Sequence, residues 1–103
     1  MNFITSREFT ANCAWEAISI ANMHGITTRL HWTNEPYIWH VNDGEEVFVV
    51  PDGSFAMHYR DEDGEHVKRM EIGDIFYANI GTEHVAHPLG EARVLVVERE
   101  GSE

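Results

Sequence analysis

Short segments in which apolar and polar residues alternate, each ending in a turn, constrain the fold of this chain most. Phe55 and Met57 alternate with small or polar residues, which is the period of a strand with one buried face. Asp63 and Gly64 then favour a hairpin turn, and a second strand is expected over residues 66–72. This part of the sequence therefore predicts a β-hairpin.

The same pattern recurs along the chain, and turn signals separate the segments. A short helical turn is expected near residues 6–9, where Ser6 is a suitable N-cap, and the C-terminal Gly-Ser-Glu is expected to fray. About eight or nine short strands in one chain predict an all-β sandwich or small barrel. The further strands expected on residue type cover residues 14–22, 26–32, 75–80 and 92–100.

Length and charge limit the class of protein and its partners. The 103 residues suffice for one domain, residues 1–103, with a single core. Eighteen acidic against seven basic residues give a formal charge of −11, which repels phosphate backbones and anionic lipid, so we expect neither nucleic acid nor membrane as a partner. No signal peptide is recognisable in residues 1–7, and the single Cys13 fits a reducing cytoplasm.

Two clusters of potential ligand residues occur in the sequence. The first runs His40-x-Asn42, then Glu46 after three residues, and a glycine at position 53. The second runs from glycine 73 through Asn79-x-Gly81 to a histidine at position 84. Each cluster alone is a weak signal, whereas the pair in this order is more specific.

These clusters resemble the two motifs of the cupin superfamily, at residues 40–53 and 73–84. The resemblance covers roughly residues 30–100 and implies a double-stranded β-helix, a jelly-roll barrel, of the kind found in small single-domain cupins described as mannose-6-phosphate isomerase-like. Three positions depart from the family pattern: Asn42 replaces the second histidine of the first motif, Asn79 replaces a proline, and Pro88 stands where asparagine is frequent.

Strand geometry explains why this spacing suits a metal. Residues two apart face the same side of a strand, so His40 and Asn42 project together, and after a turn Glu46 can share that inward face while Glu45 points outward. His84 must arrive from a neighbouring strand. The expected ligands are therefore His40, Asn42, Glu46 and His84, and the expected ion is divalent iron, manganese or zinc. An amide oxygen binds soft ions less well than imidazole, which favours manganese or iron(II).

Three functions remain open at this point. A metal-dependent oxygenase or isomerase would act on a small organic molecule at the open positions of the ion. If Glu46 instead forms an internal ion-pair network with His40 and His84, the chain is a metal-free barrel that binds a small ligand. The third function is metal-free acid–base catalysis, with His84 or His40 as the base and Tyr77 as the acid.

The remaining histidines and aromatic residues are expected to lie outside the site. His31 and Arg29 are expected at the surface, with the alternative that they border the pocket mouth, where Arg29 would hold a carboxylate or phosphate. Tyr37 and Trp39 are expected to face away from the barrel interior, toward the partner subunit of a homodimer. The other residues expected at the surface or in packing are His24, His58, His66, His87, Trp32 and Tyr77.

Overall fold

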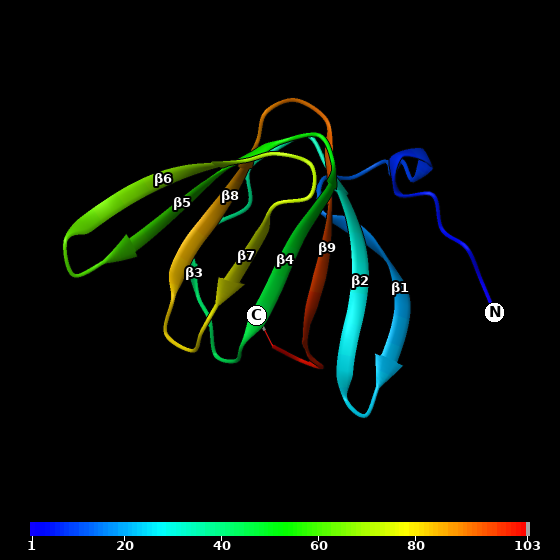
Figure 1. Cartoon of the computed structure of the whole chain (residues 1–103), viewed down its shortest axis with the longest axis horizontal. Helices are drawn as coiled ribbons and strands as arrows, with labels where there is room; N and C mark the ends of the chain where they lie inside the picture. Colours follow the sequence, from blue (N-terminus) through cyan, green and yellow to red (C-terminus); the bar gives the residue numbers. More distant parts are fainter. Residues whose placement is uncertain (103) are drawn as a thin grey trace.

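In a computed structural model that describes residues 1–102, the chain forms nine strands in two antiparallel sheets (Figure 1). One sheet has the strand order β1-β2-β9-β4-β7, and the other has the order β3-β8-β5-β6. The elements are η1 (Ser6–Glu8), β1 (Glu16–Met23), β2 (Ile26–Thr33), β3 (His40–Val41), β4 (Glu46–Asp52), β5 (Phe55–Asp61), β6 (Gly64–Met70), β7 (Ile75–Ala78), β8 (Glu83–Pro88) and β9 (Ala92–Arg99).

The two sheets share one hydrophobic core between their inner faces. Phe48 from β4 packs edge-to-face against Phe55 from β5, with ring centroids 5.5 Å apart, and so joins the two sheets directly. Strand alternation places every second residue of these strands in this layer. The core comprises Phe48, Val50, Phe55, Met57, Met70, Ala86, Ala92, Val94 and Val96.

This arrangement confirms the predicted all-β jelly roll. The helical turn expected near residues 6–9 is a 3-10 turn, η1, and the central hairpin is β5–β6. The hairpin tip differs slightly from the prediction: Glu62 and Asp63 form it, and Gly64, with φ of +115°, is already the first residue of β6. Among the described residues, no helix is long and apolar enough to cross a membrane.

Strand pairing brings the predicted ligand residues to one end of the barrel. His40 on β3 is the register partner of His84 on β8, within the smaller sheet. Glu46 begins β4 in the larger sheet and is the register partner of Glu98 on β9. The histidines and the carboxylates therefore approach the same space from opposite sheets.

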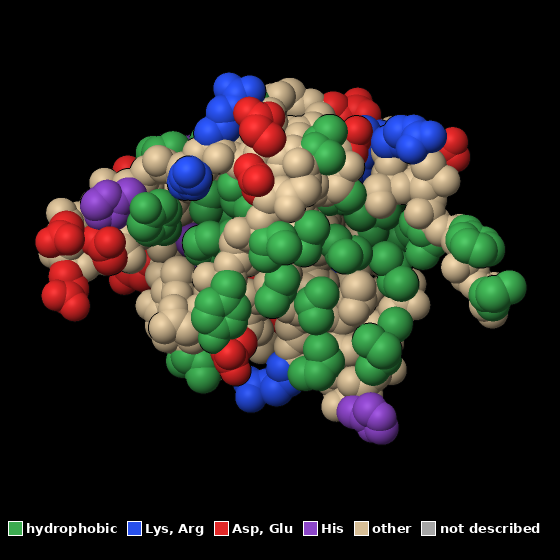
Figure 2. Space-filling view, viewed as in Figure 1, with side chains coloured by type: hydrophobic (Ala, Val, Ile, Leu, Met, Phe, Trp, Pro, Cys, Tyr) green, Lys and Arg blue, Asp and Glu red, His purple; other side chains and the backbone are tan. Residues whose placement is uncertain are grey.

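The outer face of the larger sheet is apolar as well. Val47 pairs with Val97 of β9 on one side and with Tyr77 of β7 on the other, and Val49 pairs with Leu95 in the same way. An exposed antiparallel sheet face usually carries polar residues. This face therefore differs from an ordinary solvated surface, and Figure 2 shows hydrophobic side chains gathered over it.

Candidate metal centre and its cavity

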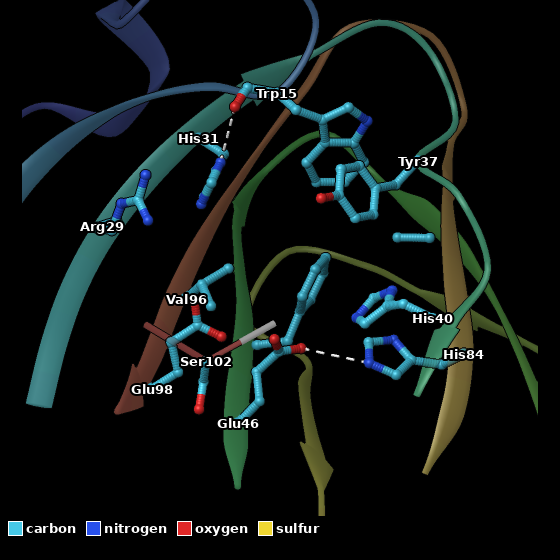
Figure 3. A pocket seen from close by; sticks show the side chains of 12 residues that line it. Trp15, Arg29, His31, Tyr37, His40, Glu46, His84, Val96, Glu98 and Ser102 are labelled. Atoms are coloured by element: carbon cyan, nitrogen blue, oxygen red, sulfur yellow. Dashed lines mark hydrogen bonds and ion pairs between the residues drawn. The ribbon is translucent and has the colours of Figure 1, made fainter. Parts of the chain in front are cut away.

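Three potential ligand residues converge between the sheets. His40, Glu46 and His84 each offer one nitrogen or oxygen atom, and these atoms all lie within 4.8 Å of one another. Glu46 and His84 are buried, and His40 is half-buried. The imidazole rings of His40 and His84 have centroids 4.2 Å apart, as expected for register partners on adjacent strands (Figure 3).

His40 has the hydrogen-bonding pattern of a metal ligand. Its Nδ1 lies 3.2 Å from the carbonyl oxygen of Ile38. A carbonyl only accepts, so Nδ1 carries the hydrogen and Nε2 keeps a free lone pair. Metal-binding histidines are usually oriented by such a bond from the other ring nitrogen.

Asn42 holds His84 instead of pointing freely into the site. The Nδ2 group of Asn42 donates to the carbonyl oxygen of Gly44 at 3.2 Å, so the amide oxygen faces Nε2 of His84 at 2.6 Å. Since this oxygen only accepts, Nε2 of His84 donates, and its Nδ1 is buried without a hydrogen-bond partner among the described residues. An ion that bound Nε2 would take the place of this hydrogen and release the Asn42 amide oxygen.

Burial suppresses the charges in the site. Burial, followed by a hydrogen bond and charge repulsion from Glu98, raises the pKa of Glu46 to about 8. Burial, followed by the charge of His40, lowers the pKa of His84 to about 4. The 3.6 Å approach of Glu46 Oε1 to His84 Nε2 therefore joins two neutral groups at pH 7, and the alternative of an internal ion pair between them is not supported.

The metal-ligand cluster opens into a cavity of about 280 Å³. This volume is near the lower limit for small-molecule pockets. Its walls combine ligand residues, charged groups and aromatic rings (Figure 3). The lining residues are Trp15, Arg29, His31, Tyr37, His40, Glu46, Phe48, His84, Ala86, Val96, Glu98 and Ser102.

One sequence-based expectation about the cavity was wrong. Tyr37 was expected to face away from the interior, but it lines the cavity and packs edge-to-face on His40, with centroids 5.5 Å apart. Arg29 and His31 both line the cavity, in line with the alternative that they border the pocket mouth, and Arg29 is also exposed at the surface. In the C-terminal tail, Ser102 lies in the cavity wall with its hydroxyl buried. Fraying of the tail stays a prediction, and Glu103 lies outside the described residues.

Tyr77 does not take part in the site. Its side chain is 56% exposed, belongs to the outer face of the larger sheet, and donates a hydrogen bond to Glu45. Tyr77 therefore does not lie where it could act as the acid in metal-free acid–base catalysis.

Other surface expectations hold in part. His24 is exposed in the β1–β2 turn, and Trp39 stacks under the guanidinium of Arg60, 3.7 Å from the ring centroid. His58 and His87 pack against each other on the outer face of the smaller sheet, with centroids 4.1 Å apart. None of these residues lines the cavity.

Sequence reasoning missed Glu98, which shares a hydrogen bond with Glu46. The signal was present, because strict alternation places Glu98 on the same face as Val94 and Val96, both of which are buried. The β-branched residues of segment 92–100 indicate a core strand, and that interpretation gives Glu98 no role in a site.

The residues present fit a divalent ion. Two imidazoles and one carboxylate are the donor types that iron, manganese and zinc accept, and the cavity leaves room for further ligands on one side. Asn42 does not offer a free oxygen, because His84 occupies it. The fit therefore rests on three side chains, with Asn42 as the neighbour that orients His84.

Comparison with known proteins gives structural neighbours only. No protein-family model matches the sequence, and no curated protein matches it. A cupin-2 domain protein from Shewanella frigidimarina is 24% identical, with a TM-score of 0.77 over 87% of this chain and 85% of that one. A cupin superfamily protein from Desulfitobacterium hafniense is 11% identical, with a TM-score of 0.73 over 92% of this chain and 86% of that one.

A third neighbour is an enzyme with metal centres. Oxalate decarboxylase from Bacillus subtilis, described for its Mn(II) centres, is 22% identical, with a TM-score of 0.66 over 75% of this chain but only 22% of that one. At such identities the likeness concerns the fold. Together with the two motifs and the strand order, these neighbours show that the chain has the jelly-roll fold of the small cupins.

Proposed function

We propose that this chain binds one divalent metal ion through His40, Glu46 and His84 and holds a small organic molecule in the adjoining cavity. The observation that carries this proposal is the convergence of the three ligand atoms within 4.8 Å of one another. Three such groups on rigid strands leave further positions of an ion open for a ligand. The Mn(II) centres of oxalate decarboxylase, which has a similar fold, lend support.

The residues around the ion have separable roles in this proposal. A bound divalent ion supplies Lewis acidity and open coordination positions, as an isomerase or oxygenase requires. His40 keeps Nε2 available because its Nδ1 is bonded to Ile38. Before an ion binds, Asn42 holds the ring of His84 in place, and Phe48 with Trp15 keeps part of the cavity wall apolar. We favour manganese or iron(II), since the site offers no thiolate and only two imidazoles.

Calorimetric titration of the metal-stripped protein with Mn²⁺, Fe²⁺ and Zn²⁺ tests the proposal. We expect one ion per chain, with at least a tenfold loss of affinity, about 1.4 kcal/mol, in His40→Ala and in Glu46→Gln. His58→Ala is the matched control, because His58 lies on the outer face of the smaller sheet. Binding that is equally strong in all three variants would refute the proposed ligand set.

A metal-free barrel that binds a small ligand is the second candidate. Two observations favour it: Nε2 of His84 is already hydrogen-bonded, and the raised pKa of Glu46 keeps its carboxyl group uncharged. Neither group then needs an ion as a partner. In that case a ligand would raise the melting temperature equally with and without a chelator, and added metal would leave the melting temperature unchanged.

We also propose a homodimer and a cytoplasmic location. The apolar outer face of the larger sheet, around Val47, Val49, Leu95 and Val97, supports the homodimer better than Tyr37 and Trp39 do. The location rests on the single exposed Cys13, which forms no disulfide within the chain. Fractionation of cells that express the tagged protein tests the location.

A further inference from the structure

The cavity has a second wall opposite the metal ligands, and β2 provides its polar groups. Arg29 and His31 lie two residues apart on β2 and pair with Val96 and Val94 of β9, whose side chains point into the core. Both side chains therefore lie on the inner face of the sheet. Figure 3 shows them across the cavity from His40 and His84.

His31 presents a hydrogen-bond acceptor to this cavity. Its Nδ1 lies 3.0 Å from the backbone carbonyl oxygen of Trp15 and must donate to it. Burial lowers the pKa of His31, so the ring is neutral near pH 7 and Nε2 carries a lone pair. In Figure 3 the ring points from Trp15 into the cavity, so this lone pair is available to a ligand that donates.

Arg29 presents a cation that no group in the described part of the chain neutralises at close range. Its guanidinium lines the cavity, yet it forms no hydrogen bond and no ion pair with residues 1–102. Burial raises the pKa of Glu98, and the positive charge of Arg29 lowers that pKa by a smaller amount. Guanidinium groups bind carboxylates with two parallel hydrogen bonds, which makes a carboxylate the natural partner here.

Charge balance in the site also favours an anionic ligand. A divalent ion with Glu46 as its only anionic ligand would retain one positive charge, and Arg29 adds a cation on the opposite wall. A ligand with a negative charge would reduce this excess of positive charge, and burying an uncompensated charge is costly. Aromatic rings of Trp15, Tyr37 and Phe48 complete the walls and suit a small carbon skeleton.

We infer that the cavity takes a small hydroxycarboxylate, whose carboxylate binds Arg29 and whose hydroxyl donates to Nε2 of His31. This inference rests on the proposed function, because the rest of the ligand would extend toward the ion held by His40, Glu46 and His84. Arg29 and His31 act as the pair that selects the ligand. Neither residue is a ligand of the metal.

Calorimetry on the metal-loaded protein tests this inference with two matched series of probes. The first series is lactate, propionate and lactamide, and the second is mandelate, phenylacetate and mandelamide. In each series the second probe lacks only the hydroxyl group, and the third keeps the hydroxyl group but lacks the carboxylate charge. We expect the hydroxycarboxylate of at least one series to bind about tenfold or more tightly than both of its relatives. Equal affinities within both series, or no binding by any probe, would overturn the inference.

Variants then assign the preference to each residue. Arg29→Met should abolish the preference for carboxylate over amide, and His31→Phe should abolish only the preference for the hydroxyl. Arg7→Met and His24→Asn are matched controls, since both residues are exposed and outside the cavity. Neither substitution should change the order of affinities among the probes. A preference for carboxylate over amide that persists in Arg29→Met would overturn the inference.

Metal content of the same preparations separates this inference from the proposed function. Metal retained in Arg29→Met together with lost carboxylate preference supports both. Metal binding without any hydroxycarboxylate preference in the wild type defeats the inference alone. A wild type that binds no metal but keeps the expected order of probe affinities defeats the proposed function alone. Arg29 and His31 would then still be the residues that select the ligand.

Discussion

Asn42 determines how the candidate metal site is organised at the scale of single residues. The sequence predicted its position beside His40 and its inward direction, and the structure agrees, since its side chain is only 2% exposed. Its role could not be predicted from spacing, because an inward amide can bind an ion or a neighbouring side chain equally well. The structure shows the second: Asn42 accepts from His84 and donates to Gly44.

Restoring a histidine at this position should strengthen metal binding. Asn42→His removes the acceptor that occupies Nε2 of His84 and adds an imidazole at the site. We expect the affinity for Zn²⁺ to rise about tenfold or more, which corresponds to about 1.4 kcal/mol. Competition with a chromophoric chelator measures this change. Unchanged or weaker affinity in a variant with a normal circular dichroism spectrum would contradict the role assigned to Asn42.

The raised pKa of Glu46 should appear in the stability of the metal-free protein. In the folded state this pKa is about 8, against an ordinary value of 4.5. The folded protein therefore binds more protons than the unfolded chain between these values, and stability falls as pH rises. His84, with a pKa lowered from 6.5 to about 4, acts in the opposite direction but only below pH 6.5. The contribution of Glu46 therefore stands out above pH 6.5.

From pH 6.5 to 8 we expect the chelator-treated wild type to lose up to about 2 kcal/mol of unfolding free energy. Glu46→Gln should lose clearly less over the same interval, because it cannot release this proton. Urea unfolding at several pH values provides the measurement. Identical pH profiles of the two proteins would show that Glu46 has an ordinary pKa.

At the scale of elements, strand alternation predicted well wherever a regular strand exists. It placed Glu46 inward, and this holds because residues 46–52 form β4; Glu45, the residue before that strand, is exposed as predicted. It failed for Tyr37, because residues 34–39 form no strand in the structure and a period of two has no meaning there. Alternation therefore predicts side-chain direction within a strand and at the residue next to it, as for Asn42 and Glu45, but not across a longer loop.

For the inner face of β2, the sequence left two placements open for a different reason. Leu30 and Trp32 are buried but belong to the outer face of the larger sheet, while Arg29 and His31 face the cavity. A sequence with apolar residues on both faces of a sheet cannot indicate which face is the interior. Only the pairing of β2 with β9, a contact far apart in sequence, resolves this ambiguity.

The glycine at the end of the first motif should be required for close packing after β4. Gly53 has φ of +79°, and a Cβ atom at this position would lie 2.7 Å from Cβ of Ala92 and 2.9 Å from its backbone. We expect Gly53→Ala to cost about 2 kcal/mol or more, from backbone strain and from the clash with a neighbouring strand. Chemical denaturation measures this loss.

Gly90→Ala separates the two causes. Gly90 also has a positive φ, of +93°, but a Cβ atom there would meet nothing within 4 Å. We expect it to lose about 1 kcal/mol from strain alone. Equal losses in the two variants would mean that the contact with Ala92 contributes nothing.

At the scale of the whole molecule, the apolar outer face of the larger sheet is the feature that a monomer leaves unexplained. Val47, Val49, Leu95 and Val97 are half-buried side by side in the centre of this face. A second copy that packs there would remove these side chains from water. The residues expected from sequence to form this contact, Tyr37 and Trp39, lie elsewhere.

Light scattering at micromolar concentration should therefore give twice the mass of the chain. Val97→Lys should shift the mass toward that of the monomer, because it places a charge in the centre of the proposed contact. Val67→Lys is the control, since Val67 is 57% exposed on β6, in the other sheet. A monomeric wild type would exclude this homodimer.

The metal content of untagged protein, measured by elemental mass spectrometry, tests the central claim most directly. We expect close to one manganese, iron or zinc per chain in the wild type, and at least a tenfold loss in His84→Ala. His87→Ala, altered on the same strand but facing outward, should keep its metal, and His40→Ala provides a second test if the buried substitution impairs folding. A wild type without metal that also fails to take up added ions, or a His84→Ala variant with full metal content, would contradict a metal centre formed by His40, Glu46 and His84.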